Sequence, residues 1–332
     1  MRKIALLILW LCGCMGMLPA KGQGEADYAR ADSMAGLFPG HSLDHPALLA
    51  HKLTQGLEGD KERFRALYRW VCTNITNDYG LYLRNRRKQV KWQSEPEKLA
   101  EWQRKFAPLV FKRLRKHHAT LCTGYAYILR ELARHVGLEA ELINGYGRTA
   151  NSNVDGEALV NHSWNAIRLD GVWYLCDPTW SSGYIREGGV VSAYDDDVYF
   201  LVEPELFILN HYPEDVGWTL LNEPPALEDF LSGPLSYKPA CEFGFKPERD
   251  KMRQQVAKGT PWKVGFEVAP GLEGAVGLRI ADRDMQPIIQ KRKGGFILSH
   301  SFGSKGHYDV HITVKGRIVA TYSVEVVSAS GI

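Results

Sequence analysis

A histidine and an aspartate, His162 and Asp177, lie on the two arms of a predicted hairpin. Between them stands Asp170-Gly171, a dipeptide that strongly favours a two-residue type I′ turn between strands. A turn there places Trp164 opposite Asp177, and His162 shares the face of Trp164 because strand side chains alternate. An imidazole and a carboxylate can span the diagonal backbone separation of about 7 to 8 Å. The sequence therefore predicts a His–Asp pair.

Cys122 is the nucleophile that such a pair would serve. It stands at the expected start of a helix, where the helix dipole lowers the pKa of a thiol, and a nearby imidazolium lowers it further. The thiolate would attack a carbonyl carbon, His162 would transfer the proton, and Asp177 would fix the tautomer of the ring. Backbone N–H groups at Cys122 would stabilise the oxyanion. Each residue alone is commoner as a packing or turn residue, so the prediction depends on all three.

The elements that must position these residues follow from apolar spacing and turn residues. Helical spacing of apolar residues predicts helices over 61–72, over 95–106 with an interruption at Pro108, and over 122–136. Alternation predicts strands over 139–146, 162–169 and 172–176, and the Asn/Ser/Gly-rich segment 149–156 is expected to be a loop. A helix followed by antiparallel strands is typical of an α+β fold.

The C-terminal part of the sequence has a different pattern, with short apolar runs separated by Gly, Pro and charged turns. The runs are WKVGFEV, AVGLRIA, GFILSHSF, YDVHITV and IVATYSVEV. They predict a small antiparallel β-sandwich. A chain of 332 residues also exceeds what one hydrophobic core usually serves. We therefore predict a signal peptide at 1–22, a catalytic domain at 23–238 and a β-sandwich domain at 239–332.

Two stretches, LCTGYAYILRELARHVGLEAELINGYGR and NHSWNAIRLDGVWYLCDPTW, resemble the core of the transglutaminase-like superfamily, with Cys, His and Asp in the same order. The flanking YRWVCTNITND and YFLVEPELFILNHYPEDVGWTLL resemble its kyphoscoliosis-peptidase-like branch, so the resemblance covers roughly residues 60–235. It implies a papain-like or transglutaminase-like core, in which a helix bearing the cysteine packs on an antiparallel sheet.

The resemblance assigns Cys122 as nucleophile, His162 as general base and acid, and Asp177 as the orienting carboxylate. Members of this branch often have a tyrosine before the upstream aspartate, whereas this chain has Asn77 before Asp78. A tyrosine contribution to substrate binding or to the oxyanion site is therefore not expected here.

The N-terminus has the pattern of a secretory signal, with Arg2 and Lys3 before the apolar run 4–11. Cleavage after Gly22 would make Gln23 the first residue of the mature chain, and cleavage after Ala20 is the alternative. A lipoprotein box ending at Cys14 is a weaker alternative. No later stretch reaches about 18 uninterrupted apolar residues, so no transmembrane helix is expected. Because of the signal pattern, the mature protein is expected to be exported: periplasmic, on the cell surface or secreted.

The cysteines and acidic residues predict neither a metal site nor a cofactor. Cleavage would leave four cysteines, none in a C-x-x-C pair or at zinc-ligand spacing. An oxidising compartment permits a disulfide among Cys72, Cys176 and Cys241, but buried free thiols are the simpler expectation. The run 195–197 of three aspartates lacks EF-hand spacing and is interpreted as a solvated loop.

Positive charge is concentrated in residues 84–116, which hold twelve Lys or Arg and three Glu. The net charge of the whole chain is +3, so the rest of the chain is acidic. This segment is interpreted mainly as a solvated helix face, with an anionic envelope surface or polymer as a possible partner. No nucleic-acid-binding motif accompanies it, so a nucleic-acid partner is not expected. The sequence does not indicate an oligomeric state.

These features together predict extracytoplasmic, cysteine-dependent acyl chemistry on a peptide or amide. A peptidase or amide hydrolase working through a thioester is the leading hypothesis, and acyl transfer to an amine, as in a protein-glutamine transglutaminase, is the alternative. A non-catalytic envelope or adhesion module on the same scaffold is the alternative from a different class.

Overall fold

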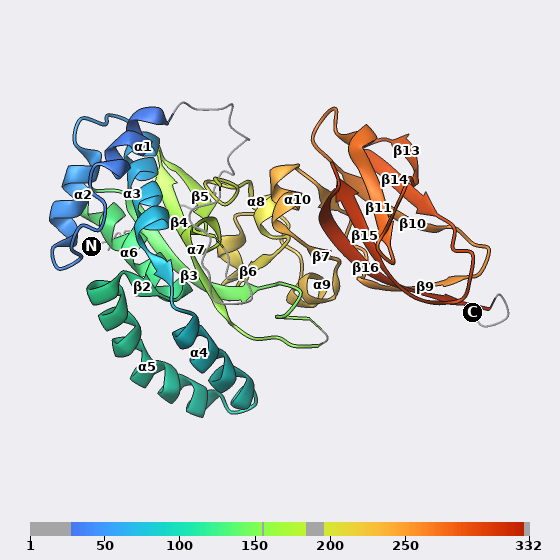
Figure 1. Cartoon of the computed structure of the whole chain (residues 1–332), viewed down its shortest axis with the longest axis horizontal. Helices are drawn as coiled ribbons and strands as arrows, with labels where there is room; N and C mark the ends of the chain where they lie inside the picture. The colour runs from blue at the N-terminus through green and yellow to red at the C-terminus, as the bar shows by residue number, and fades with distance from the viewer. Residues whose placement is uncertain (1–27, 155, 184–195, 329–332) are drawn as a thin grey trace, which may run out of the picture.

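The computed structural model describes residues 28–154, 156–183 and 196–328. The predicted signal peptide at 1–22, the cleavage site before Gln23 and the first aspartate of the 195–197 run lie outside these residues. A part with helices and a sheet stands beside an all-β part (Figure 1). Within the described ranges, no helix has the length and apolar character needed to cross a membrane.

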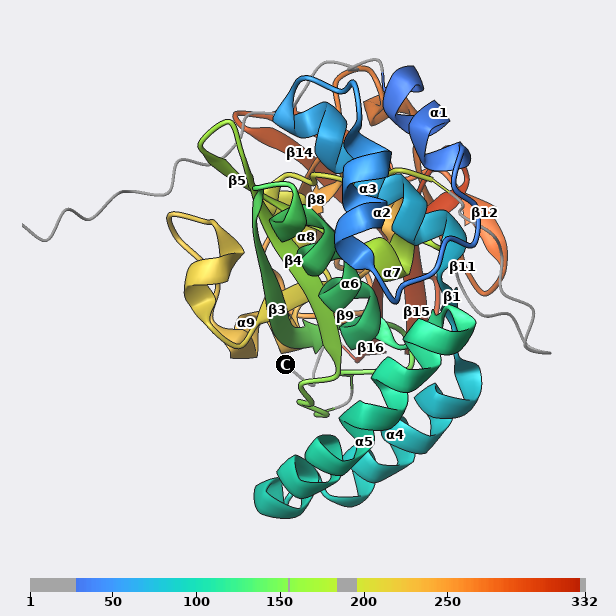
Figure 2. The same ribbon diagram turned by 90° about the vertical axis from the view of Figure 1, so that its left-hand side faces the viewer.

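The first part is built on a four-stranded antiparallel sheet in the order β5-β4-β3-β6. Its strands are β3 (Glu139–Gly147), β4 (His162–Leu169), β5 (Val172–Cys176) and β6 (His211–Pro213). The helices on one face of the sheet are α1 (Ala29–Gly36), α2 (Pro46–Thr54), α3 (Asp60–Asn74) and α6 (Cys122–His135), as Figures 1 and 2 show. Phe64, Tyr68 and Leu129 from these helices are fully buried with Ile167 of the sheet. The predicted α+β core, with a cysteine-bearing helix on an antiparallel sheet, is confirmed.

The opposite face of the sheet is also buried. Trp164 and Leu175 pack there with Tyr199 and Phe207 in a second apolar cluster. Of two short helices near the sheet, α8 (Pro204–Phe207) contacts β5, whereas α7 (Pro178–Ser181) lies against α3 and α6. Because both faces are covered, strand side chains of either orientation lie in a dry interior.

The hairpin that carries His162 and Asp177 forms as predicted, with the same strand limits. Asp170 (φ 50°) and Gly171 (φ 81°) both adopt the left-handed backbone that a type I′ turn requires. Strand pairing extends from Leu169 opposite Val172 to Asn165 opposite Cys176. Asp177 is therefore the next residue beyond the end of β5.

The prediction that Pro108 interrupts its helix is wrong, because α5 (Pro96–His117) continues through it. A proline inside a helix removes one N–H and frees the carbonyl four residues earlier. Pro108 and Arg104 are both exposed, so that carbonyl lies on the solvent side of the helix and water can satisfy it. The helix α4 (Tyr79–Lys91) runs beside α5. Apolar spacing did not predict it as a separate helix. The pair projects from the body of the molecule (Figures 1 and 2).

Much of the basic segment 84–116 interacts with the protein itself. Arg86 pairs with Glu157 (2.7 Å), and Arg113 pairs with Asp78 (2.7 Å). The Arg84 guanidinium lies over the Trp102 ring, 5.3 Å from its centroid. These contacts fit the solvated-helix interpretation, and an anionic partner stays a prediction.

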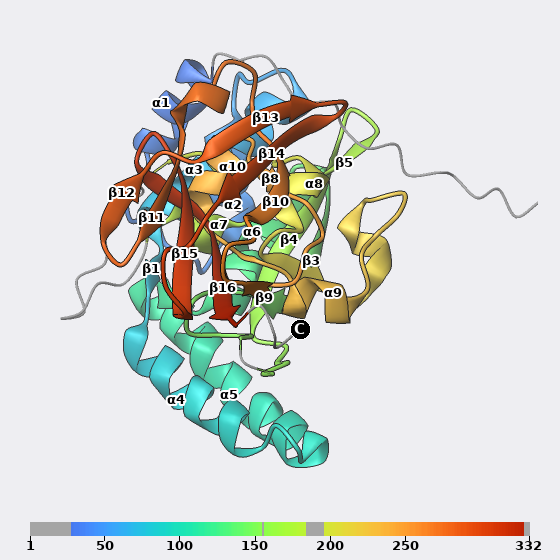
Figure 3. The ribbon, with the colours of Figure 1, turned by 90° about the vertical axis from the view of Figure 1, so that its right-hand side faces the viewer.

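The second part contains two sheets packed around a separate apolar cluster that includes Trp262, Phe266 and Tyr322 (Figure 3). One sheet has the order β13-β14-β10-β8, with β8 (Lys246–Pro247), β10 (Trp262–Glu267), β13 (Ile288–Arg292) and β14 (Gly295–His300). The other has the order β12-β11-β15-β16-β7, with β7 (Leu235–Ser236), β11 (Val276–Ile280), β12 (Arg283–Met285), β15 (Gly306–Val314) and β16 (Arg317–Val327). The predicted all-β sandwich is confirmed.

One strand of the sandwich departs from the antiparallel pattern. β9 (Arg253–Ala257) pairs parallel with β16 from Ser323 onward, whereas β7 pairs antiparallel with Ala320 and Thr321 of the same strand. The two short strands therefore share one edge of β16. Because β7 precedes residue 239, the sandwich sheet includes chain from before the predicted boundary, and the domain limits 23–238 and 239–332 stay predictions.

The remaining elements are short. The strands β1 (Thr76–Asn77) and β2 (Ala119–Thr120) form a parallel pair next to α6. The helices α9 (Leu227–Ser232) and α10 (Lys238–Glu242) and the 3-10 turn η1 (Val216–Thr219) lie between the two parts along the chain, and η2 (Glu273–Ala275) precedes β11.

Candidate active site

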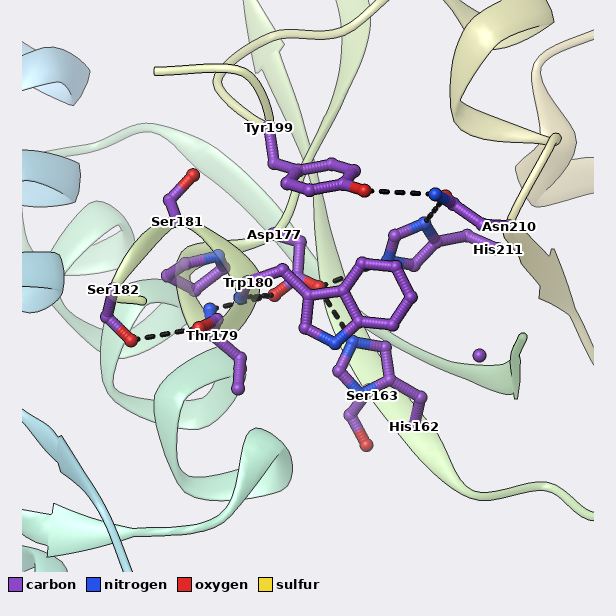
Figure 4. Close-up of polar contacts among 12 residues, drawn as sticks. His162, Ser163, Asp177, Thr179, Trp180, Ser181, Ser182, Tyr199, Asn210 and His211 are labelled. Carbon is purple, nitrogen blue, oxygen red and sulfur yellow. Dashed lines mark hydrogen bonds and ion pairs between the residues drawn. The ribbon is translucent and has the colours of Figure 1, made fainter. Parts of the chain in front are cut away.

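His162 and Asp177 meet at the open end of the hairpin (Figure 4). His162 is the first residue of β4, and its Nε2 donates a hydrogen bond of 2.7 Å to Oδ2 of Asp177. The Trp180 ring stacks on the imidazole with a centroid separation of 4.9 Å and an interplanar angle of 29°. The structure thus brings together the His–Asp pair expected from the register of the hairpin.

Asp177 is fully buried and saturated with donors. It caps the N-terminus of α7, where its Oδ1 accepts from the backbone N–H groups of Thr179 (2.7 Å) and Trp180 (3.2 Å). Pro178 occupies the first helical position, where a missing N–H costs nothing. Burial alone would raise the pKa of this carboxyl, but the charge and hydrogen bond of His162 and the hydrogen bond of His211 hold it well below its usual range. Asp177 is therefore a fixed anion.

Cys122 is the first residue of α6 and is half-buried. Its thiol forms a side-chain hydrogen bond with His162 and accepts one from the backbone N–H of Ser163. Burial acts to raise the pKa of the thiol, but these two partners and the positive charge of His162 outweigh it, so the pKa lies below its ordinary value. Since Nε2 of His162 donates its hydrogen bond to Asp177, Nδ1 is the ring nitrogen that can bond to the Cys122 thiol.

The His162 imidazole is held in its charged form. Burial opposes the charge, yet Asp177 and Cys122 together raise the pKa of this ring to about 10. A thiol of lowered pKa beside an imidazolium is the arrangement that cysteine acyl chemistry uses, because the nucleophile ionises more readily and the leaving group has a proton donor.

The other three described cysteines lie in a different environment. Cys72, Cys176 and Cys241 are buried free thiols, and burial raises the pKa of each one. The described residues therefore contain no disulfide, and Cys122 is the cysteine with a lowered pKa.

Sequence reasoning missed a fourth residue of the site, His211. Its Nε2 donates to the same Oδ2 of Asp177 at 3.1 Å, and its ring stacks on Phe207 at 4.1 Å (Figure 4). Its Nδ1 lies 2.7 Å from Oδ1 of Asn210, and Nδ2 of Asn210 donates to the Tyr199 hydroxyl (2.9 Å). Burial is the main cause that lowers the pKa of His211 to about 4, so this ring is neutral at neutral pH.

His211 is visible in the sequence, but no rule of residue spacing links it to Cys122, His162 or Asp177. The residue lies in β6, 34 positions after Asp177, and reaches the site only because β6 pairs with β3. Its segment was recognised as part of a family resemblance, without a role for the histidine. A search for further histidines in that segment would have found it.

Ligand atoms of His162, Asp177 and His211 lie within 4.8 Å of one another, which is close enough to share a metal ion. Each imidazole nevertheless directs its Nε2 proton at one carboxylate oxygen, so an ion would have to displace both protons. The chemistry of this donor set is that of a hydrogen-bonded relay. Asp196 and Asp197 of the aspartate run are engaged elsewhere, by Lys238 (2.8 Å) and Arg65 (2.8 Å between Arg65 Nη2 and Asp197 Oδ2).

The residue that departs from the family pattern, Asn77, lies in β1 opposite Thr120 and does not line the catalytic cleft. Its neighbour Asp78 caps α4 by accepting from the backbone N–H of Leu81 (3.0 Å). The aromatic and amide residues near the hairpin are structural: Trp164 is fully buried, and Asn165 donates to the Ala126 carbonyl (2.9 Å).

Residues 47–178 match the family model described as the Transglutaminase-like superfamily, and this range contains Cys122, His162 and Asp177. This part of the chain is therefore similar to the transglutaminase-like superfamily, a class that supports cysteine-dependent acyl chemistry in general. Within that superfamily, it is similar to kyphoscoliosis peptidase of Mus musculus, with 32% identity over 187 residues. The Homo sapiens kyphoscoliosis peptidase is 31% identical over 189 residues.

Each of these two alignments covers 55% of this chain and 25% of the relative. The chain thus spans about a quarter of the length of the curated relatives it matches. Among solved structures, a TGase crystal structure is similar at 13% sequence identity and a TM-score of 0.30, over 53% of this chain and 36% of that one.

Proposed function

We propose that this protein is a cysteine-dependent hydrolase of peptide or amide bonds, with Cys122 as nucleophile, His162 as acid and base, and Asp177 as the orienting carboxylate. The observation that carries the proposal is the geometry of the site: Cys122 at the start of α6 and the His162 ring line the same cleft, and Asp177 holds that ring by a hydrogen bond of 2.7 Å. A packing cysteine has no need of such a partner, and the three buried cysteines have raised pKa values instead.

The reaction begins with attack of the Cys122 thiolate on the carbonyl carbon of the scissile amide. A C–S bond forms, and the carbonyl oxygen takes the negative charge, which N–H groups in the first turn of α6 stabilise. His162 gives its proton to the leaving nitrogen as the C–N bond breaks, and a thioester on Cys122 remains. His162 then takes a proton from water, and the hydroxide attacks the thioester carbon. The C–S bond breaks, the carboxylic acid is released, and the Cys122 thiolate and the His162 imidazolium are restored.

Asp177 keeps the imidazole in the orientation this cycle needs. Its Oδ2 accepts from Nε2 of His162, which leaves Nδ1 directed at the thiol. The two backbone hydrogen bonds to Oδ1 prevent the carboxylate from rotating. The charge of Asp177 also stabilises the imidazolium that is present at rest and after proton uptake from water.

An expression-matched comparison of wild type and Cys122→Ala tests the proposal. Each variant is incubated with a mixture of proteins and peptides, and released ammonia, amines and new peptide termini are measured by mass spectrometry. We expect products with the wild type that are absent with Cys122→Ala. Identical product profiles would favour the different-class alternative, a non-catalytic envelope or adhesion module.

Competition between water and an added amine for the acyl group distinguishes hydrolysis from transfer. We propose water as the usual acceptor, since no separate amine site is needed for it. Addition of biotinylated cadaverine to the same incubation would reveal transfer. Amine incorporation greater than carboxylate release, and lost in Cys122→Ala, would make the protein an acyltransferase of the transglutaminase type with the same triad.

We also propose export, on the basis of the basic and apolar pattern of residues 1–22. The mass of the N-terminal peptide of the mature protein tests it. A chain that begins at Gln23 supports cleavage of a signal peptide, whereas an acylated Cys14 would indicate a membrane-anchored lipoprotein.

A further inference from the structure

The Cys122 thiol and the His162 ring open into a cleft of about 500 Å³. One wall is α5 and the end of α4, and the other is the segment 158–163 that leads into β4. Gln89 of α4 is buried and donates to the Val160 carbonyl across the cleft (3.2 Å). The two walls are therefore held at a fixed separation before any substrate binds.

The face of α5 that lines the cleft is apolar, although the helix as a whole is rich in Lys and Arg. Leu99, Phe106, Ala107 and Val110 line the cleft at helical spacing. The Lys and Arg residues of α5 between 96 and 110 are absent from the lining. Phe106 and Val110 are mostly buried against Leu81, whereas Leu99 is half-buried, so the stripe forms an apolar wall of the cleft beside the nucleophile.

The polar groups in the cleft are mostly uncharged carboxamides. They are contributed by Asn85, Gln89, Gln93, Gln103, Asn144 and Asn161. A carboxamide offers both a donor and an acceptor, which complements the N–H and C=O groups of a peptide backbone. Among the described lining residues, Glu214 is the single carboxylate, and the cleft has no Lys or Arg.

The orientation of these amides leaves donors free near the thiol. The Ser163 hydroxyl donates to Oδ1 of Asn144 (2.9 Å), and within the described residues Nδ2 of Asn144 donates to no partner. Gln93 and Gln103 are exposed on the opposite wall. Hydrogen-bonding groups therefore stand on both sides of the space above Cys122.

We propose that this cleft binds an extended, uncharged peptide segment, with an apolar side chain seated against Leu99, Phe106 and Val110. This inference rests on the proposed acyl chemistry at Cys122, because the cleft is continuous with the thiol. From Pro96 to Val110 the wall is about 21 Å long at 1.5 Å per helical residue, which matches about six residues of extended chain. Burial of one leucine-sized side chain there supplies binding free energy, whereas a charged side chain against the α5 wall, whose lining residues are all uncharged, would be desolvated without a partner on that wall.

Hexapeptide chloromethyl ketones provide the test, since the thiolate displaces chloride and forms a stable C–S bond. A positional set carries Leu, Asp or Lys at one position at a time in an alanine background, and second-order labelling of Cys122 is followed by intact mass. We expect the Leu probe to label at least tenfold faster than the Asp and Lys probes at one or more positions. Equal rates for the three side chains at every position would overturn the proposal.

A pair of variants localises the preference. Leu99→Lys places a charge in the cleft, whereas Glu97→Lys adds positive charge to an exposed position of the same turn outside the cleft. We expect Leu99→Lys to lower the rate for the best Leu probe about tenfold and to raise it for the matching Asp probe, with Glu97→Lys unchanged within twofold. Equal effects of the two variants would contradict the assigned wall.

Iodoacetamide separates this inference from the proposed function, because it is too small to use the cleft. Selective alkylation of Cys122 by iodoacetamide with no side-chain preference among the peptides would reject the cleft assignment and leave the acyl chemistry in place. Absence of selective alkylation would reject the chemistry itself. Glu97→Lys is expected to leave the iodoacetamide rate within twofold of wild type, and circular dichroism checks that Leu99→Lys is folded.

Discussion

One carboxylate oxygen of Asp177 accepts hydrogen bonds from two imidazoles in this site, and the two rings differ in protonation state. His162 is charged because it lies between Asp177 and the Cys122 thiol, whereas His211 is neutral because it is fully enclosed by aromatic rings. A neutral His211 donates a hydrogen bond without competing for the negative charge of Asp177. The carboxylate therefore remains available to stabilise the imidazolium of His162.

At the scale of single residues, Cys122 is expected to be the most reactive thiol. Iodoacetamide at about pH 6 should alkylate it first, because thiolates react and its pKa is lowered, while Cys72, Cys176 and Cys241 are buried with raised pKa values. His162→Ala removes the charge and hydrogen bond that lower the pKa, so labelling should slow at least tenfold at this pH. Peptide mapping measures both effects, and faster labelling of any buried cysteine would refute the argument.

Asp177→Asn should retain the fold and lose at least about 10³-fold in turnover. The amide oxygen can still accept from the N–H groups of Thr179 and Trp180, so α7 stays capped. The amide nitrogen would then face His162 and donate to Nε2, which forces the ring proton onto Nδ1 and towards the thiol. Circular dichroism checks the fold, and the pH profile of Cys122 alkylation should move to higher pH. An unchanged profile would mean that Asp177 acts only as a helix cap.

At the scale of elements, β3 approaches His162 at a glycine. A Cβ on Gly147 would lie 2.8 Å from Cβ and 3.1 Å from Cγ of His162, closer than real contacts allow. Gly147→Ala should therefore displace the ring, destabilise the protein by about 1 to 3 kcal/mol and slow Cys122 alkylation. Gly36→Ala, where a Cβ meets open space, is the matched control. Urea unfolding and alkylation rates measure the two effects, and equal behaviour of the variants would contradict this tight packing.

The hairpin and the helices show which structural features can be predicted from local sequence. The hairpin was predictable to the residue because Asp170-Gly171 sets both the turn type and the register. The helix bearing Cys122 was predictable because its apolar spacing is strong. The continuation of α5 through Pro108 was not, because it depends on solvent access to a freed carbonyl and on an apolar stripe that lines a cleft.

Contacts between distant segments explain what else was missed. His211 joins the site only through the pairing of β6 with β3, and no turn or short spacing encodes that pairing. The parallel pairing of β9 with β16 is likewise a long-range contact. Residue types and local spacing therefore predicted that His162 and Asp177 form a pair and that Cys122 begins a helix, while the residues that surround them could be found only from the fold.

At the scale of the whole molecule, the site exists only when the first part is folded, because its four residues come from α6, β4, the end of β5 and β6. The rings and the thiol have ordinary pKa values in the unfolded chain and shifted ones in the native state. Proton uptake or release must therefore accompany unfolding, and the free energy of unfolding must depend on pH.

The direction in which the free energy of unfolding changes with pH differs from group to group. His211 has a lowered pKa of about 4, so between about pH 4 and pH 6.5 the unfolded chain binds a proton there that the native protein does not, and stability rises with pH. His162 has a raised pKa of about 10, so above about pH 6.5 the native protein holds a proton that the unfolded chain loses, and stability falls with pH. The lowered pKa of Cys122 acts oppositely, because the unfolded chain keeps a thiol proton that the native thiolate has lost.

Urea unfolding across this range should therefore show three behaviours. In the wild type, His211 should make the free energy of unfolding rise by up to about 1.4 kcal/mol per pH unit between about pH 4 and pH 6.5. Above about pH 6.5, His162 should make it fall with pH, and the opposing contribution of Cys122 should reduce that fall. His211→Phe should flatten the lower limb, since the ring that takes up the proton is gone. Cys122→Ala should make the upper limb fall more steeply, since the opposing thiol is gone. His307→Phe, at an exposed histidine of the sandwich, is the control and should change neither limb. An upper limb that is no steeper in Cys122→Ala than in the wild type would contradict the lowered pKa of the Cys122 thiol, and its pairing with a charged His162 would have to be abandoned.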